Sequence, residues 1–226
     1  MKLLALDTST EACSTALLCE GEVIFHHQHA PRKHADLILP MLDELLAEAE
    51  IKLSQLDAIA FGRGPGSFTG VRIATSVTQG IAFSADKPVV PVSTLASVAQ
   101  QVIDEQNESY VLTALDARMG EVYWAGWKKN PKGFAENVIP ESVLPPEKIQ
   151  KPEQDNWAGA GNAWKIYEEI LSQKLADNLK NIYSDTTPHA ASIVRLAEWY
   201  FNDGLAVPAE EALPVYLRNK VAEKKP

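Results

Sequence analysis

A glycine-rich loop at residues 61–72, Phe-Gly-Arg-Gly-Pro-Gly-Ser-Phe-Thr-Gly-Val-Arg, constrains the fold of this chain more than any other segment. The apolar residues 56–61 before it predict a short buried strand, and the apolar residues after it recur at helical spacing to about residue 84. Three glycines permit backbone angles and close approaches that a side chain would forbid, namely Gly62, Gly64 and Gly66. The segment therefore predicts a strand that leads through a tight loop into a helix.

The start of this helix has two interpretations. Ser67 or Thr69 can cap the first free amides, and free amides with the helix dipole behind them form an anion site. The other interpretation is a sharp turn that lets a helix with small side chains pack closely. Because the sequence lacks the Gly-Lys-Ser/Thr of a P-loop and the G-x-G-x-x-G of a dinucleotide-binding fold, the turn is favoured over phosphate binding.

The composition is typical of a soluble globular protein. The 226 residues suffice for one large domain or two small ones, with 46% hydrophobic and 23% charged residues. No apolar run approaches the ~20 residues of a membrane helix, and Asp7 follows the N-terminus too soon for a signal peptide. We therefore expect a cytoplasmic protein that binds no membrane. Cys13 and Cys19 lie about 20 Å apart on one predicted strand, which excludes a disulfide between them on that strand.

The charge distribution disfavours broad nucleic-acid binding. The formal net charge is −9, which gives no global attraction for phosphates. Basic residues gather at the end of the chain, as Arg218, Lys220, Lys224 and Lys225. Such a tail is usually solvated and poorly ordered, and a contact with RNA or with an acidic partner is the alternative interpretation.

Strand and helix patterns divide the chain into two halves, 1–106 and 107–226. In the first half we expect strands and helices, besides the glycine-loop unit, at 2–7, 13–19, 23–29, 34–50, 88–92 and 95–106. Pro40 predicts a kink or a later start of the helix over 34–50. The apolar residues of that helix form two ridges, so it either lies deep in the core or buries a second face against a partner.

The second half repeats the opening of the first. A strand over 110–115 ends in Asp116, and a tight turn leads to a partner strand over 121–128. Further elements are loops and short strands over 129–156, a strand at 157–162, and helices over 163–175 and from 188 to 201. This weak repeat predicts an α/β protein with two similar lobes and a cleft between them.

Four motifs in order along the chain resemble those of the bacterial TsaB (YeaZ) family. They are Leu-Ala-Leu-Asp-Thr-Ser-Thr at 4–10, the glycine loop at 62–72, Asp-Ala-Arg-Met-Gly-Glu-Val-Tyr at 116–123 and Pro-Val-Tyr-Leu-Arg at 214–218. The match spans essentially the whole chain, and the glycine loop is its most specific part. The resemblance implies a two-lobed actin-like (ASKHA) fold with duplicated ribonuclease-H-like lobes.

The resemblance also implies a function. Members are non-catalytic partners of TsaD, which with TsaE and TsaC places a threonylcarbamoyl group on N6 of the adenosine beside the anticodon. The implied assembly is a heterodimer with TsaD, a larger complex with TsaE, a homodimer when TsaD is absent, and contact with tRNA through the complex. The family's helix-pair interface corresponds here to Leu37, Met41, Leu45, Phe68, Arg72, Ala74 and Ser76. Small residues after the glycine loop suit close helix packing, although the same residues can serve the protein's own core.

The hairpins that bind phosphate in nucleotide-binding members of this fold class are altered here. Their first hairpin reads Asp-x-Gly-Thr/Ser, whereas Asp7 and Thr8 are followed by Ser9, whose Cβ would crowd a phosphate. Asp116 stands in the second hairpin, followed by Arg118 instead of a glycine-rich turn. We therefore interpret Asp7, Thr8, Ser9 and Asp116 as a vestigial phosphate loop, and we expect no cofactor and no ATP binding by this chain alone.

Other catalytic constellations are missing from the sequence. None of the five histidines forms the His-x-x-x-His that TsaD-type metal binding needs, so we expect no metal site and no catalytic residue. A peptidase has no support from His-Glu-x-x-His or Gly-x-Ser-x-Gly motifs, and rests on fold analogy alone. The alternative function is a stand-alone ATP-dependent transferase or kinase-like enzyme that uses the interlobe cleft, with Asp7, Thr8 and Asp116 holding Mg-phosphate.

Overall fold

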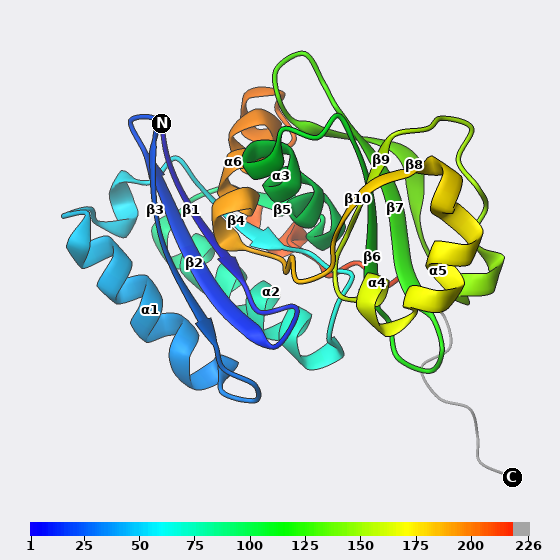
Figure 1. The fold of residues 1–226 in the computed structure, drawn as a ribbon. Coiled ribbons are helices and arrows are strands. Elements are labelled where there is room, and N and C mark those ends of the chain that lie inside the picture. The colour runs from blue at the N-terminus through cyan, green and yellow to red at the C-terminus, as the bar shows by residue number, and fades with distance from the viewer. Residues whose placement is uncertain (219–226) are drawn as a thin grey trace, which may run out of the picture.

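The computed structural model describes residues 1–218, which form two five-stranded sheets and the helices that cover them (Figure 1). The first half contains β1 (Lys2–Asp7), β2 (Ala12–Cys19), β3 (Glu22–His29), α1 (His34–Glu48), β4 (Ala58–Gly62), α2 (Phe68–Ala85), β5 (Val89–Val92) and α3 (Thr94–Gln106). The second half contains β6 (Tyr110–Asp116), β7 (Val122–Lys129), β8 (Ala135–Leu144), β9 (Trp157–Ala160), α4 (Ala163–Ile166), α5 (Glu168–Leu175), β10 (Leu179–Tyr183) and α6 (Ala190–Asn202).

The two sheets have the same topology. Their strand orders are β3-β2-β1-β4-β5 and β8-β7-β6-β9-β10. In each sheet the first three strands along the chain pair antiparallel, and the last two join in parallel. The predicted duplication of ribonuclease-H-like lobes is therefore confirmed at the level of strand pairing.

Side-chain alternation along β1 shows how the first sheet is buried on both faces. Leu4 and Leu6 belong to the core beneath α1 and α2, whereas Leu3 and Ala5 belong to the core on the opposite face. Successive residues of a strand point to opposite faces, so β1 contributes to both cores. Helices cover both faces, which explains why β1 reads as an almost continuous apolar run.

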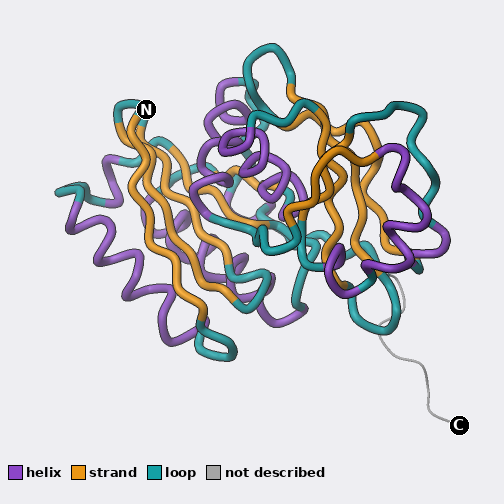
Figure 2. Tube along the Cα trace, in the orientation of Figure 1, coloured by secondary structure: helices purple, strands orange, loops and turns teal. Residues whose placement is uncertain are grey.

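The last helix of each half packs against the sheet of the other half. Helix α3 contacts β6, β7 and β8, and α6 returns from the second half to contact β1, β2 and β4. Figure 2 shows these two helices side by side between the sheets, and they also contact each other. The predicted boundary between residues 106 and 107 thus separates the two sheets, but α3 and α6 each pack against the sheet on the other side of it.

The second half differs most from the sequence-based expectation. The segment 129–156, expected to hold loops and short strands, contains the ten-residue strand β8, and β10 was not predicted. Both are edge strands with almost no buried residues, so the hydrophobic alternation that marks a strand is weak. Pro140 is tolerated because β8 lies at an edge. The helix expected over 163–175 is broken at Tyr167 into α4 and α5.

Several smaller predictions can be compared with the structure. Helix α1 begins at His34 and continues through Pro40, so a later start is wrong. Cys13 and Cys19 lie on β2 as free thiols. Within the described residues no helix has the length and apolarity to cross a membrane. Of the predicted basic tail, Lys220, Lys224 and Lys225 lie outside the described residues.

The segment after α6 returns to the first lobe and then reaches the second. Val207 pairs with Val89 beside β5, and the Gln79 amide donates to the carbonyl of Ala212 at 3.0 Å. Further along, the Arg218 guanidinium bonds the Glu121 carboxylate at 2.6 Å. This C-terminal segment, residues 207–218, therefore contacts both lobes.

Candidate functional site

Asp7, at the end of β1, is a buried carboxylate with one satisfied oxygen. Its Oδ1 accepts hydrogen bonds from the Ser9 backbone N–H at 3.0 Å and from the Ser9 hydroxyl at 2.8 Å. Its Oδ2 has no hydrogen-bond partner among the described residues. Burial raises the pKa of Asp7 to about 6, and the two bonds from Ser9 only partly offset this effect.

The glycine loop is packed directly against this turn. A Cβ at Gly62 would collide with Asp7 Oδ2, and a Cβ at Gly66 would come within 2.6 Å of the Ser9 carbonyl oxygen. At Gly70, a Cβ would collide with the carbonyl oxygen of Thr8. The glycines at these positions therefore allow the loop and the 7–9 turn to approach each other, which supports the turn interpretation.

Hydrogen bonds fasten the loop to the same turn. The Ser67 backbone N–H donates to the Ser9 carbonyl at 2.7 Å, and the Thr8 hydroxyl donates to the Gly70 carbonyl at 2.7 Å. Ser67 caps α2, as one of the two predicted candidates, because its hydroxyl accepts from the Gly70 N–H. The Ser67 amide and the Thr8 hydroxyl, which could otherwise bind a phosphate, are thus used in hydrogen bonds within the protein.

Asp116, at the end of β6, makes its contacts inside its own lobe. The Arg118 backbone N–H donates to its Oδ1 at 3.0 Å, and the Arg118 guanidinium lies 3.1 Å from Oδ2. The Tyr167 hydroxyl donates to Oδ1 at 3.3 Å. Asp7 is therefore held by its own hairpin and Asp116 by its own hairpin and Tyr167, and no contact between the two aspartates is observed in residues 1–218.

The predicted helix-pair interface is only partly accessible. Met41, Leu45 and Ala74 are buried in the core between the first sheet and the helices α1 and α2. Their side chains cannot reach a partner in this conformation, which corrects the prediction for these three residues. Of the remaining four, Leu37 is half-buried, and the exposed ones are Phe68, Arg72 and Ser76.

A surface groove of about 450 Å³ lies along the exposed part of this helix pair. Its wall on the α1 side is Ala35. Its α2 side consists of Phe68, Thr69, Arg72, Ile73, Ser76 and Val77. Ala35, Thr69, Ile73 and Val77 were not predicted, because periodicity identifies an apolar face but not where that face meets solvent.

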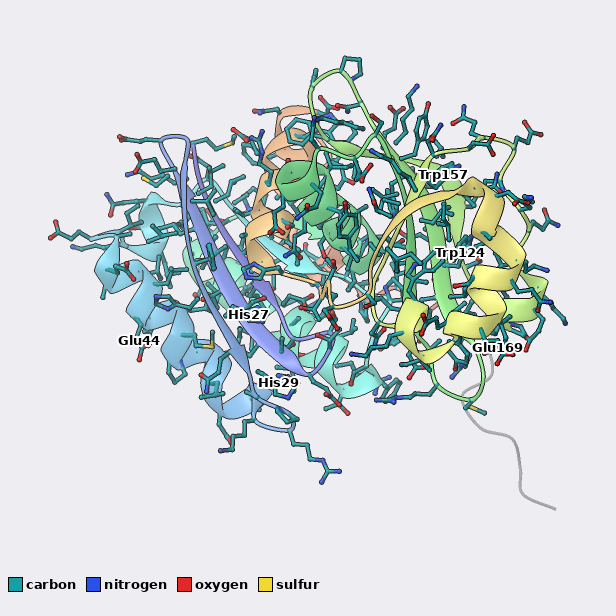
Figure 3. The ribbon with its side chains drawn as sticks, in the orientation of Figure 1. His27, His29, Glu44, Trp124, Trp157 and Glu169 are labelled. Atoms are coloured by element: carbon teal, nitrogen blue, oxygen red, sulfur yellow. The ribbon has the colours of Figure 1, made fainter. Side chains whose placement is uncertain are left out.

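Two stacked histidines lie at the start of α6. Figure 3 shows His27 and His29 on β3, where the His27 ring stacks on His189 with ring centres 4.6 Å apart. His189 Nδ1 accepts from the Ala191 N–H and so caps α6. Burial and the neighbouring His27 lower the pKa of His189 to about 4. No cluster of three potential metal ligands occurs within residues 1–218.

Acid is expected to weaken the packing of α6 through His189. The pKa of His189 is about 4 in the folded protein and 6.5 without perturbation, so its contribution to stability is complete above pH 6.5. That contribution is lost as the pH falls towards 4, by about 1–2 kcal/mol after allowance for solvent screening. His189→Asn retains a capping side chain but does not titrate. Urea unfolding at pH 7.5 and 4.5 should show that the free energy of unfolding falls less in this variant than in the wild type. An equal fall in both proteins would contradict the assignment to His189.

Comparison with known proteins places these features in a family. A model of TsaD, tRNA N6-adenosine threonylcarbamoyltransferase, matches residues 24–225. The chain is 40% identical to the tRNA threonylcarbamoyladenosine biosynthesis protein TsaB of Escherichia coli, covering 100% of this chain and 98% of that protein. It is 41% identical to TsaB of Haemophilus influenzae, covering 100% of this chain and 97% of that protein.

A solved structure agrees over nearly the whole length. YeaZ from Pseudomonas aeruginosa superposes with a TM-score of 0.90 at 48% identity, covering 96% of this chain and 99% of that chain. Together with the duplicated sheets, this similarity confirms the predicted two-lobed actin-like fold. Sequence identity, coverage and fold agree, and the chain belongs to the TsaB (YeaZ) family.

Proposed function

We propose that this chain is a non-catalytic subunit of the machinery that makes threonylcarbamoyladenosine (t6A) in tRNA, and that it binds TsaD through the exposed α1–α2 face. Its relatives carry the name of the t6A biosynthesis protein TsaB. The single observation that carries the binding proposal is the groove on this face, which is flanked by the exposed side chain of Phe68. An apolar groove with an aromatic rim is typical of a protein-binding surface.

The geometry around Asp7 and Asp116 supports a role without catalysis. A kinase-like site needs carboxylates that are free to hold Mg-phosphate. Asp7 is instead buried with Oδ2 packed against Gly62, and both oxygens of Asp116 are engaged with Arg118 and Tyr167. We infer that the chain alone does not bind ATP.

One feature favours the alternative of a stand-alone ATP-dependent transferase. Asp7 Oδ2 is buried without a hydrogen-bond partner among the described residues, and such a carboxylate oxygen is a suitable ligand for a metal ion. Calorimetry with ATP and Mg²⁺ on the isolated protein separates the two functions. Binding in the micromolar range would favour the enzyme, and absence of binding is the result expected for the scaffold.

Mixing the protein with TsaD is expected to give a one-to-one complex. Size exclusion with light scattering would measure its mass, and any homodimer should be displaced because it uses the same face. Addition of TsaE should give a larger assembly, and tRNA should be modified by the reconstituted machinery only when this chain is present. Full modification without this chain, or no complex even with TsaE and nucleotide, would contradict the proposal.

A further inference from the structure

A second surface groove lies at the end of α6, which covers the face of the first sheet opposite to α1 and α2. The turn between β7 and β8 lies beside this end of the helix (Figure 1). The groove has a volume of about 310 Å³, and its lining residues are Lys132, Phe134, Arg195, Glu198, Trp199, Asn202 and Asp203. This volume is at the lower end of the range for small-molecule sites, so the groove suits a ligand smaller than a nucleotide.

Hydrogen bonds fix the wall that the β7–β8 turn contributes. The side-chain oxygen of Asn130 accepts from the backbone N–H of Lys132 at 2.9 Å and from that of Phe134 at 3.0 Å. From α3, the side-chain amide of Gln100 donates to the Gly133 carbonyl at 3.0 Å. The turn is therefore ordered without a ligand, and little conformational freedom remains to be lost on binding.

Aromatic rings and a compensated arginine form the middle of the groove. The rings of Phe134 and Trp199 stack with their centres 5.3 Å apart. The Arg195 Cζ lies 5.1 Å from the ring centre of Phe134, and Arg195 Nη1 lies 2.9 Å from a carboxylate oxygen of Glu198. Burial raises the pKa of Asp104 on α3, and the charge of Arg195 partly offsets this effect. Arg195 therefore already interacts with two carboxylates and has little charge left for an anionic ligand.

Two opposite charges of the lining are left over, one on each wall. Lys132 on the turn and Asp203 at the end of α6 are exposed, and neither forms a salt bridge within residues 1–218. The Asp203 N–H donates to the Trp199 carbonyl, so its carboxylate stands at the negative end of the helix dipole. Because the last turn of α6 contains no basic residue, a cationic group of a ligand would be stabilised there.

We propose that this groove binds a free α-amino acid as its zwitterion, with the ligand's carboxylate at Lys132 and its ammonium group at Asp203 and the carbonyl end of α6. The side chain of the ligand lies against the ring of Trp199, whose face also attracts an ammonium group. A phosphate ligand fits less well, because Glu198 and Asp203 repel it. A ligand with only one charge leaves either Lys132 or Asp203 without a partner. The site is separate from the α1–α2 face, so this inference does not depend on binding to TsaD.

The test titrates the full chain, labelled with ¹⁵N, with L-alanine, L-leucine and L-phenylalanine and records NMR spectra. At least one of them is expected to give saturable shifts of the Trp199 indole N–H, which the variant Trp199→Phe identifies, and of the backbone signals of 130–134. Because the ion pairs are exposed to water, Kd should lie in the millimolar range. N-acetyl-L-phenylalanine lacks the ammonium group and L-phenylalaninamide lacks the carboxylate. Each should bind about fivefold more weakly than L-phenylalanine, the effect of one exposed ion pair.

Single variants connect the binding to the two charges. Lys132→Ala and Asp203→Asn should each raise Kd for the amino acid about fivefold. Lys132→Arg keeps the positive charge on the same turn and is the matched control, which should bind like the wild type. In Lys132→Ala the amino acid and its amide should bind equally, because the carboxylate has lost its partner.

Each outcome either supports or overturns the inference. Saturable binding that weakens in both Lys132→Ala and Asp203→Asn would establish the two-charge site. The absence of saturable shifts with all three amino acids would overturn it. Equal binding of acetate or methylammonium would also overturn it, because a single charge would then suffice. Failure of the chain to bind TsaD would contradict the proposed function and leave this result unchanged.

Discussion

Gly70→Ala is expected to lower the free energy of unfolding by about 3 kcal/mol, because overpacking against a fixed backbone is costly. The new Cβ would collide with the carbonyl oxygen of Thr8, and would lie 3.4 Å from the Cα of Ser9. Neither atom belongs to a flexible side chain that could move aside. The start of α2 would shift, and with it the bond from the Thr8 hydroxyl to the Gly70 carbonyl.

A matched control lies in the same helix. Gly80 is exposed, and a Cβ there meets no atom within 4 Å. Because alanine favours a helix over glycine, Gly80→Ala should raise stability by about 0.5–1 kcal/mol. Urea unfolding of both variants measures the difference in the free energy of unfolding, which should be about 3.5–4 kcal/mol. Similar effects at the two positions would show that the close approach of Gly70 to the 7–9 turn is not what requires glycine.

Asp7→Asn is expected to stabilise the protein at pH 8 by up to about 3 kcal/mol, the value of a shift of about two pKa units. The pKa of Asp7 is raised from 3.8 to about 6 by burial, so the folded state binds a proton more readily than the unfolded state. Above pH 6 the buried charge destabilises the fold, and this penalty disappears as the pH falls from 6 towards 3.8. Asparagine has nearly the same shape and can still accept the bonds from Ser9 through its oxygen.

The dependence on pH is what identifies the carboxylate. Urea unfolding at pH 8 and pH 4 should give a large gain for Asp7→Asn at the higher pH and little change at the lower. Asp36→Asn, on the exposed side of α1, removes the same charge and should have little effect at either pH. An equal gain in the free energy of unfolding for Asp7→Asn at both pH values would mean that the buried charge does not cause the stabilisation. His189 titrates in the same window with the opposite sign, so each variant is compared with the wild type at the same pH.

Short-range sequence patterns were sufficient to predict the strand and the helix on either side of the glycine loop. The apolar run before the loop forms β4, Ser67 caps α2, and the helix ends at Ala85, close to the predicted end. The repeated strand–Asp–turn–strand pattern at Asp7 and Asp116 marks two lobes with one topology. These features follow from turn chemistry and from side-chain spacing, which act over a few residues. Strand β10 was not predicted, and β8 was expected only as loops and short strands, because edge strands with few buried residues have a weak hydrophobic pattern.

The accessible part of the candidate surface was decided by tertiary packing. The spacing in α1 and α2 marks Met41, Leu45 and Ala74 as apolar or small, but the sheet beneath them determines that they are buried. Tyr216 reaches Arg72, 144 residues away in sequence, through the path of the C-terminal segment. The sequence by itself determined the lobes, the loop and the helix start, because these depend on neighbouring residues. Only the tertiary structure decided which side chains face solvent and that Asp7 is buried, because both depend on contacts between distant segments.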